Sequence, residues 1–136
     1  MKTPAPLVGT LVLDCEGLSK LVADDRIVSA LVQRAHESGA HVVTSAVTPV
    51  EARNPSGRQA RFDWVLSRID VEPVTEATSR AASALLADAR LHGHKYALDA
   101  ILSATALSLP KPVVVVTSDP EDIGMLCGPR VRVIRV

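Results

Sequence analysis

The sequence predicts an α/β fold, a three-layer α/β/α sandwich built on a mostly parallel sheet of five strands. Five short apolar runs are separated by stretches with helical periodicity, an alternation typical of strand–helix–strand units. The run PVVVVT at 112–117 is apolar without alternation, as expected of a central parallel strand covered on both faces. The expected strands are Leu7–Leu13, His41–Thr44, Val71–Val74, Val113–Thr117 and Val131–Ile134.

The composition fits one folded domain. The chain has 136 residues, of which 47% are hydrophobic, and this is enough for a full core. We expect a short N-terminal tail over residues 1–6 and a single domain over residues 7–136. The N-terminal residues lack the apolar region of a signal peptide, and no apolar segment is long enough to span a membrane. We therefore expect a cytoplasmic protein, in which Cys15 and Cys127 are free thiols.

The first expected strand is followed by two predicted helices. Asp14 is well placed to cap a short helix that begins with CEGLSKLV. Asp24 and Asp25 can cap the next helix, and Gly39 ends it. The apolar stripe of this second helix consists of Ile27, Leu31 and Ala35, with Val28 and Val32 beside it.

The middle of the chain predicts two further helices. Thr48 to Glu51 reads as a capping box, with Pro49 at the first helical position. Ser56 and Gly57 precede the segment RQARFDWVLSRI at 58–69. Apolar residues recur there at helical spacing, namely Phe62, Val65, Leu66 and Ile69.

The C-terminal half predicts two long helices and an edge strand. Thr75 opens a helix that runs through Leu91 and ends at Gly93. The apolar segment ALDAILSATALSL at 97–109 forms the next helix and stops before Pro110. The final run RVRVIRV carries three arginines, and this polar content fits an edge strand better than a central one.

Four acids stand near the expected strand ends, and three of them have an adequate structural explanation. Asp14 can cap a helix, Glu51 can close a capping box, and Ser118 or Asp119 can cap the helix that begins at Pro120. Asp99 has no such explanation, because it lies inside a helical apolar segment. Its predicted helix neighbours Ser103 and Ala106 are small, which would leave room beside the carboxylate.

The positions of these acids predict a metal site. Asp14 and Asp119 follow the first and fourth strands, so their carboxylates converge if those strands are neighbours. Several carboxylates in one cleft repel each other, and oxygen-rich clusters of this kind suit hard cations such as Mg²⁺ or Mn²⁺. Such a cation activates water against a phosphodiester.

In order and spacing, four motifs resemble a PIN-domain ribonuclease, most closely a VapC-type toxin of a type II toxin–antitoxin system. The motifs are LVLD, the acid in SAVTPVEA, YALDAILSATAL and VVVVTSDPEDIGML. They cover essentially the whole chain. The resemblance implies a PIN-like fold and Mg²⁺- or Mn²⁺-dependent cleavage of RNA that leaves a 3′-hydroxyl and a 5′-phosphate. It also implies an RNA substrate, a cognate antitoxin and a homodimer.

The resemblance assigns roles by position. Asp14, Glu51, Asp99 and Asp119 would be the catalytic and metal-binding acids. Asp122 would be a candidate fifth ligand, although helix capping explains it equally well, and Ser118 would steady the site. The chain departs from the family at Cys15, where many relatives carry a small or hydroxyl residue.

The formal net charge is zero, so any positive charge that binds a ligand must be local. Aromatic residues are few, with one Trp, one Tyr and one Phe. The chain as a whole is therefore not a polycation, and we do not expect base stacking on aromatic platforms as its binding mode. Arg53, Arg58 and Arg61 follow Glu51 and are candidates for RNA binding, with a solvated helix face as one alternative. The resemblance implies another, because in the family the helical pair in this region often contacts the antitoxin or the dimer partner.

Two other α/β classes fail on their motifs. A receiver domain needs an acidic pair after the first strand, an Asp after the third and a Lys after the fifth, and none is present. A dinucleotide-binding module needs GxGxxG, which is absent. The remaining alternative is a catalytically inactive or solitary PIN domain that binds RNA or protein.

Overall fold

The computed structural model describes residues 9–136 and confirms the predicted fold. Its five strands form one sheet in the order β3-β2-β1-β4-β5, and every neighbouring pair is parallel. The strands are β1 (Thr10–Leu13), β2 (His41–Ser45), β3 (Asp70–Glu72), β4 (Val113–Thr117) and β5 (Arg132–Arg135). The predicted tail at residues 1–6, and residues 7 and 8 of the predicted first strand, lie outside the described residues.

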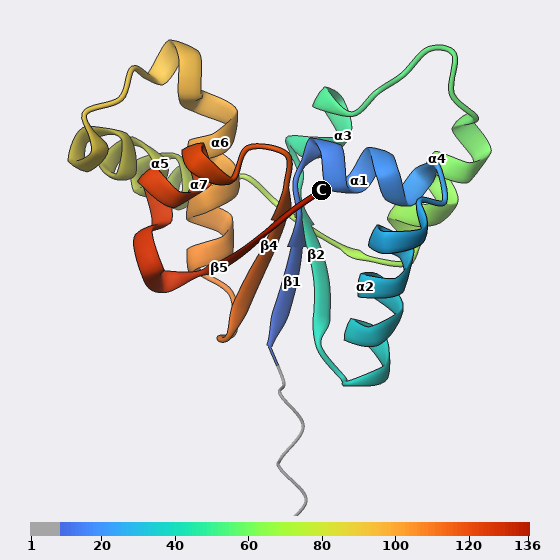
Figure 1. Ribbon diagram of the computed structural model, residues 1–136. Coiled ribbons are helices and arrows are strands. Elements are labelled where there is room, and N and C mark those ends of the chain that lie inside the picture. Colours follow the sequence, from blue (N-terminus) through green and yellow to red (C-terminus); the bar gives the residue numbers. More distant parts are fainter. Residues whose placement is uncertain (1–8) are drawn as a thin grey trace, which may run out of the picture.

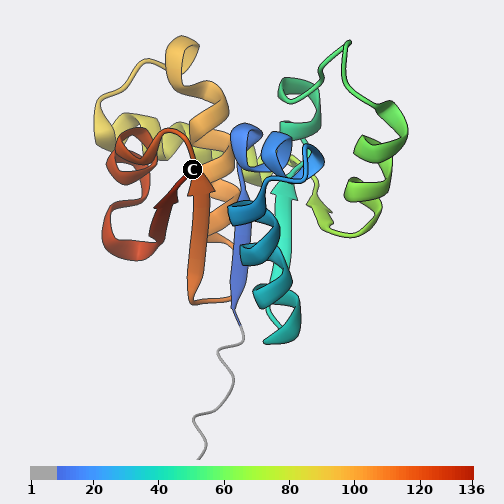
Figure 2. The same ribbon diagram turned by 45° about the vertical axis from the view of Figure 1, so that its right-hand side comes forward.

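Helices cover both faces of the sheet, as Figures 1 and 2 show. In addition to the α-helices, a short 3-10 helix at Gly128–Arg130 leads into β5. The α-helices are α1 (Cys15–Val22), α2 (Arg26–Glu37), α3 (Thr48–Glu51), α4 (Gln59–Ser67), α5 (Glu76–Ala89), α6 (Gly93–Leu107) and α7 (Pro120–Cys127).

The side chains of β1 and β4 alternate between two cores. Leu11, Leu13 and Val116 pack with α1, α2 and α4 on one face, whereas Val12 and Val115 pack with α6 and α7 on the other. A third cluster joins α5 to α6 and α7. Both central strands are buried on both faces, which explains why their sequences are apolar without alternation.

The two outermost strands are the more polar ones. In β5 the side chains of Arg132 and Arg135 are exposed, so the predicted edge position is confirmed. β3 is the opposite edge, and it is only three residues long because Pro73 cannot donate to a ladder.

Two predictions in the first half of the chain are wrong in detail. In α2 the buried residues are Val28 and Val32, whereas Ile27 is 67% exposed, so the buried face is centred one residue later than the predicted stripe. The capping box at Thr48 is also wrong. The residue before α3 is Val47, and Thr48 is a buried first helical residue that makes no capping hydrogen bond. The carboxylate of Glu51 is therefore not tied back to the backbone.

The junction between α5 and α6 differs from its prediction. Thr75 caps α5 as expected, with a reciprocal hydrogen bond to Thr78. The helix ends at Ala89 rather than running through Leu91 to Gly93, because Arg90 takes the left-handed conformation (φ 56°). Gly93 instead begins α6, which places Asp99 in the second turn of that helix.

Candidate active site

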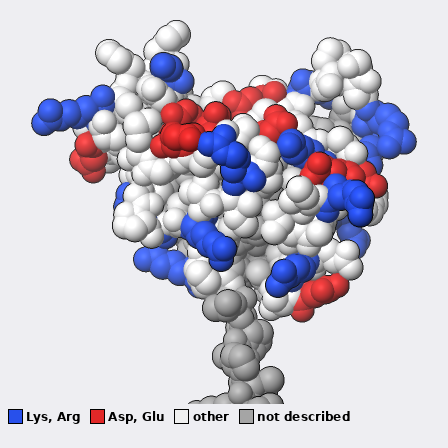
Figure 3. Space-filling model, in the orientation of Figure 1, with Lys and Arg blue, Asp and Glu red and all other residues white. Residues whose placement is uncertain are grey.

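A cleft of about 190 Å³ opens at the edge of the sheet where the parallel strands end. We call it the acidic cleft, after the carboxylates that line it. Figure 3 shows acidic side chains gathered at this edge, between the two helical lobes of Figure 1. The acids that line the cleft are Asp14, Glu16, Glu51, Asp99 and Asp119.

Asp14 is held rigidly at the end of β1. One carboxylate oxygen accepts a hydrogen bond from the amide of Gly17 at 2.8 Å, and the other accepts one from the amide of Ser118 at 3.3 Å. The first bond caps α1, so the predicted capping role is confirmed, and it coexists with a position in the cleft. Burial raises the pKa of Asp14 despite these bonds and the Thr117 hydroxyl, which lower it.

The close approach of α1 to β4 depends on Gly17. A Cβ atom at this position would lie 3.1 Å from the carbonyl oxygen of Val116 and 3.5 Å from Oδ1 of Asp14. That carbonyl already accepts the amide of Asp14 at 3.1 Å, so it has little freedom to move. The absence of a side chain thus lets the start of α1 and the end of β4 place Asp14 and Ser118 together.

Asp119 and Asp122 come from the turn after β4 and the first turn of α7. Asp119 occupies the capping position, yet its side chain makes no capping hydrogen bond, so the predicted cap is wrong. Its amide donates to the Thr117 hydroxyl at 2.9 Å, which fixes the turn. Glu121, between them, instead forms an ion pair with Arg135 at 2.6 Å.

Asp99 completes a group of three carboxylates. Asp99, Asp119 and Asp122 each offer an oxygen, and these oxygens all lie within 4.8 Å of one another. Burial, with smaller contributions from the charges of Asp122, Asp119, Glu51 and Asp14 in that order, raises the pKa of Asp99 to about 6. A donor set made only of carboxylate oxygens at this spacing fits a hard divalent cation.

Glu51 and Cys15 meet on the opposite side of the acidic cleft. Partial burial raises the pKa of Glu51, the Cys15 thiol lowers it by hydrogen bonding, and the charges of Asp14 and Asp119 raise it. Burial and the adjacent Glu51 raise the pKa of Cys15 to about 12. The thiol therefore stays protonated at neutral pH and donates to Glu51 rather than binding a cation as a thiolate.

The structure places the predicted acids together and corrects the surroundings of Asp99. Ser103 and Ala106 are both fully buried and do not line the acidic cleft, so the expected clearance beside Asp99 is wrong. The face of α6 that carries Asp99 presents Leu98 and Leu102 instead. Glu16, which was not predicted as a site residue, follows Asp14 by two residues in the first turn of α1 and also lines the cleft.

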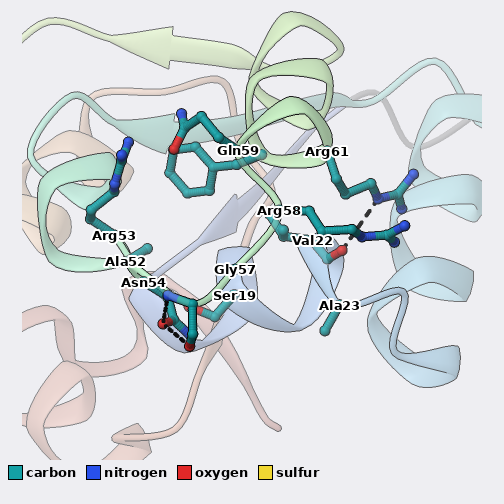
Figure 4. A pocket seen from close by; sticks show the side chains of 12 residues that line it. Ser19, Val22, Ala23, Ala52, Arg53, Asn54, Gly57, Arg58, Gln59 and Arg61 are labelled. Atoms are coloured by element: carbon teal, nitrogen blue, oxygen red, sulfur yellow. Dashed lines mark hydrogen bonds between the residues drawn. The ribbon is translucent and has the colours of Figure 1, made fainter.

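A second hollow, of about 300 Å³, adjoins the acidic cleft. We call it the arginine pocket. It lies between α1, α4 and the loop that joins α3 to α4, and Figure 4 shows Arg53 on one side and Arg58 and Arg61 on the other. The polar and aromatic residues that line it include Arg53, Asn54, Arg58, Gln59, Arg61 and Phe62.

The three predicted arginines differ in their contacts. Arg61 donates to the carbonyl oxygens of Val22 at 3.2 Å and Leu21 at 3.4 Å, and its guanidinium lies 5.0 Å from the centroid of Trp64. Arg61 therefore serves to hold α4 against the end of α1. Within residues 9–136, the side chains of Arg53 and Arg58 are exposed and form no ion pair or hydrogen bond.

Comparisons with known proteins identify the fold. No protein-family model and no curated protein sequence matches the chain. A chain of VapBC2 from Rickettsia felis, bound to a DNA fragment from their promoter, matches with a TM-score of 0.69 and 11% identity over 93% of this chain and 98% of that one. A toxin–antitoxin complex from Klebsiella pneumoniae matches with a TM-score of 0.66 and 19% identity, over 93% of this chain and 99% of that one.

A third solved structure with a similar fold also belongs to a toxin–antitoxin system. A chain of VapBC-5 from Mycobacterium tuberculosis, a member of the VapBC family of toxin–antitoxin systems, matches with a TM-score of 0.54 and 23% identity. The match covers 98% of this chain and 100% of that one. The predicted PIN-like fold is therefore confirmed over nearly the whole chain. Separately, none of the helices within residues 9–136 combines the length and apolarity needed to cross a bilayer.

Proposed function

We propose that the chain is a metal-dependent ribonuclease of the PIN-domain class and the toxin of a VapBC-type toxin–antitoxin pair. The observation that carries this proposal is the convergence of Asp14, Asp99 and Asp119, from three separate segments, on one cleft at the ends of the strands. The fold shared with proteins of toxin–antitoxin complexes supports it independently.

The acids of the cleft would contribute differently to binding a cation. Asp99, Asp119 and Asp122 present the closest group of oxygens, and Asp14 faces them from the end of β1. Two backbone amides fix the carboxylate of Asp14, so it is already oriented before a ligand arrives. Glu51 lies on the far side of the cleft, where its carboxylate can accept a proton or orient water. A bound Mg²⁺, or Mn²⁺ in its place, supplies the Lewis acid that activates water and offsets charge at phosphorus.

The remaining residues shape the cleft. Ser118 donates its backbone amide to Asp14, and this bond supports the proposal that Ser118 steadies the site. Leu98 and Leu102 line one wall and limit the access of bulk water. The products we expect are a 3′-hydroxyl and a 5′-phosphate.

The proposed partners are an antitoxin and a second copy of the chain. Trp64 is 54% exposed and lines a groove of about 420 Å³ between α2 and α4, together with Val32 and Ile69. We propose that the antitoxin contacts this groove, because Trp64 is an exposed aromatic side chain of the kind enriched at protein interfaces. Coexpression with the product of the adjacent reading frame should yield a stable complex, which Trp64→Ala should weaken.

The direct test is cleavage of single-stranded RNA by the purified chain with Mg²⁺, with Mn²⁺ and with a chelator. We expect cleavage with either cation, none with the chelator, and at least about a hundredfold loss for Asp99→Asn. Equal cleavage by wild type and Asp99→Asn would show that another nuclease does the cutting. RNA binding without any cleavage would instead favour a PIN domain that serves as a binding module.

A further inference from the structure

We propose that the arginine pocket binds one nucleotide of the RNA strand next to the scissile bond and gives the enzyme its base preference. This inference rests on the proposed ribonuclease function and goes further by naming a specificity site. It starts from the charge of the segment between Glu51 and Asp63, which has three arginines and no acid. Within residues 9–136 the guanidinium groups of Arg53 and Arg58 are left without an acidic partner.

The pocket and the acidic cleft are lined by neighbouring residues of the same two elements. On α3, Glu51 lines the cleft and the next residues, Ala52 and Arg53, line the pocket. On α1, Cys15 lines the cleft and Ser19, one helical turn away, lines the pocket. One turn of helix is about 5.4 Å, so a strand whose phosphodiester lies in the cleft reaches the pocket with a neighbouring nucleotide.

The two amide side chains of the pocket are oriented by their hydrogen bonds. The side-chain oxygen of Asn54 accepts from the amide and the hydroxyl of Ser56, at 3.0 and 2.8 Å, which leaves its NH₂ group free to donate. The NH₂ group of Gln59 donates to Asp63 at 2.8 Å, which leaves its oxygen free to accept. Figure 4 shows both residues bordering the pocket. The pocket thus presents one fixed donor and one fixed acceptor.

These groups match the parts of a nucleotide. Guanidinium groups bind phosphate, and a free amide donor and a free acceptor can read the edge of a base. The ring of Phe62, which packs partly against the core, borders the pocket where a base would stack. Phe62 is the only phenylalanine of the chain, so stacking here is confined to one pocket rather than spread over a platform. An acidic protein segment could satisfy the arginines and, through its backbone, the amide groups, but its acidic side chains would offer no ring to stack on Phe62.

The first test measures RNA binding in the Asp99→Asn background, with labelled single-stranded oligoribonucleotides. We expect the double change Arg53→Gln and Arg58→Gln to weaken binding at least about tenfold. It should also make the slope of log K against log salt shallower by about 1.4, since each phosphate contact on a single strand contributes about 0.7. Arg80→Gln, which removes an exposed arginine on α5, is the matched control and should bind like the parent protein.

The second test measures base preference in cleavage of an RNA library randomised around the cut site. Asn54→Ala and Gln59→Ala should relax the preference at one position adjacent to the cut and raise KM more than they lower kcat. Gln33→Ala is the matched control for Gln59, because Gln33 makes the same i,i+4 hydrogen bond, to Glu37 on α2. Unchanged melting temperatures confirm that the variants are folded.

The outcomes separate the two proposals. If cleavage depends on metal but the pocket variants leave RNA binding and base preference unchanged, this inference fails and the proposed ribonuclease function stands. If wild type does not cleave RNA, the ribonuclease proposal fails, and the pocket is tested by binding of the four homopolymeric oligoribonucleotides. A preference for one base that is lost in Asn54→Ala or Gln59→Ala then supports the pocket. Competition by polyglutamate as strong as that by RNA of equal charge assigns the pocket to acidic protein segments and overturns the inference.

Discussion

The acidic cleft and the arginine pocket share one edge of the sheet and carry opposite charge. Five acids and no Lys or Arg line the first, whereas three arginines and no acid line the second. The boundary between them falls within α3 and the residue after it, where Glu51 belongs to the cleft and Ala52 to the pocket. A chain whose formal net charge is zero thus separates its charges within a few residues.

This difference in charge indicates that each hollow suits a ligand of opposite charge, a cation in the acidic cleft and an anion in the arginine pocket. In the cleft, burial and mutual repulsion raise the pKa of Asp14, Glu51 and Asp99, and a cation would relieve that cost. In the pocket, Arg53 and Arg58 have no acidic partner within residues 9–136, and phosphate would supply one. A metal-dependent ribonuclease brings both ligands together, whereas a purely structural role for either hollow would favour pairing the charges within the chain.

The largest expected effect is on the rate of RNA cleavage, and it contrasts two acids of one segment, Asp119 and Glu121. Asp119→Asn should lower metal-dependent RNA cleavage at least about a hundredfold, because Asp119 belongs to the close group of oxygens. Glu121→Gln is the matched change, since Glu121 pairs with Arg135 outside this group, and it should leave the rate within about twofold. Initial rates at several Mg²⁺ concentrations measure both. A loss of the same size in Glu121→Gln would mean that general negative charge, rather than the cleft, governs the rate.

The next effect is a dependence on pH that belongs to the cleft and not to the pocket. The pKa of Asp99 is raised to about 6, so this carboxyl group takes up a proton as the pH falls through 6. A protonated carboxyl group binds a cation poorly, and we expect cleavage at limiting Mg²⁺ to fall about tenfold per unit below that pH. RNA binding by Asp99→Asn should vary much less over the same range, because arginine remains charged. Cleavage that stays constant down to pH 5 would contradict the role of Asp99.

Without metal, the same raised pKa has the opposite effect on stability. The folded state holds the proton of Asp99 more tightly than the unfolded chain, whose pKa is near 3.8. The stability that this group contributes is therefore present below pH 4 and is lost as the pH rises through 6. The cleft is expected to destabilise the metal-free protein at neutral pH.

A smaller effect tests the backbone that supports the cleft. Gly17→Ala should lower the free energy of unfolding by about 1 kcal/mol, because its Cβ would lie 3.1 Å from the carbonyl oxygen of Val116. Gly124→Ala in α7 is the matched change. With no atom within 4 Å of the added Cβ, it should raise stability by about 0.5 to 1 kcal/mol. Urea denaturation of both variants measures the difference, and equal stabilisation by the two would remove the argument for close approach at Gly17.

Much of the architecture could be predicted from the sequence, because burial on both faces leaves a clear apolar pattern. The valines of β4 predicted a central strand, and the arginines of β5 predicted an edge. The neighbouring arrangement of β1 and β4, on which the convergence of Asp14 and Asp119 depended, is present in the sheet. Asp99 was identified because no local structural role explained it.

The details that failed depend on tertiary contacts. Thr48 is of a residue type that often caps helices, but it is buried and makes no capping hydrogen bond. The carboxylate of Glu51 is therefore not held in a capping box. Asp122 ranked below the other acids because capping explained it, yet it lies within the closest group of oxygens. The hydrogen bonds that orient Asn54 and Gln59 are local, to Ser56 and Asp63. The pocket that both residues line depends on the packing of α1, α4 and the loop between α3 and α4, which the sequence does not reveal.

The most direct test of the metal site is thermal unfolding of wild type and Asp99→Asn at neutral pH, with and without Mg²⁺. We predict that the metal-free variant melts no lower than wild type, because the change removes one repelling carboxylate. Saturating Mg²⁺ at about 100 times its Kd should stabilise wild type by about 2.7 kcal/mol, a rise of several degrees, and the variant much less. Identical shifts in the two proteins would contradict the account, because the cation would then bind elsewhere.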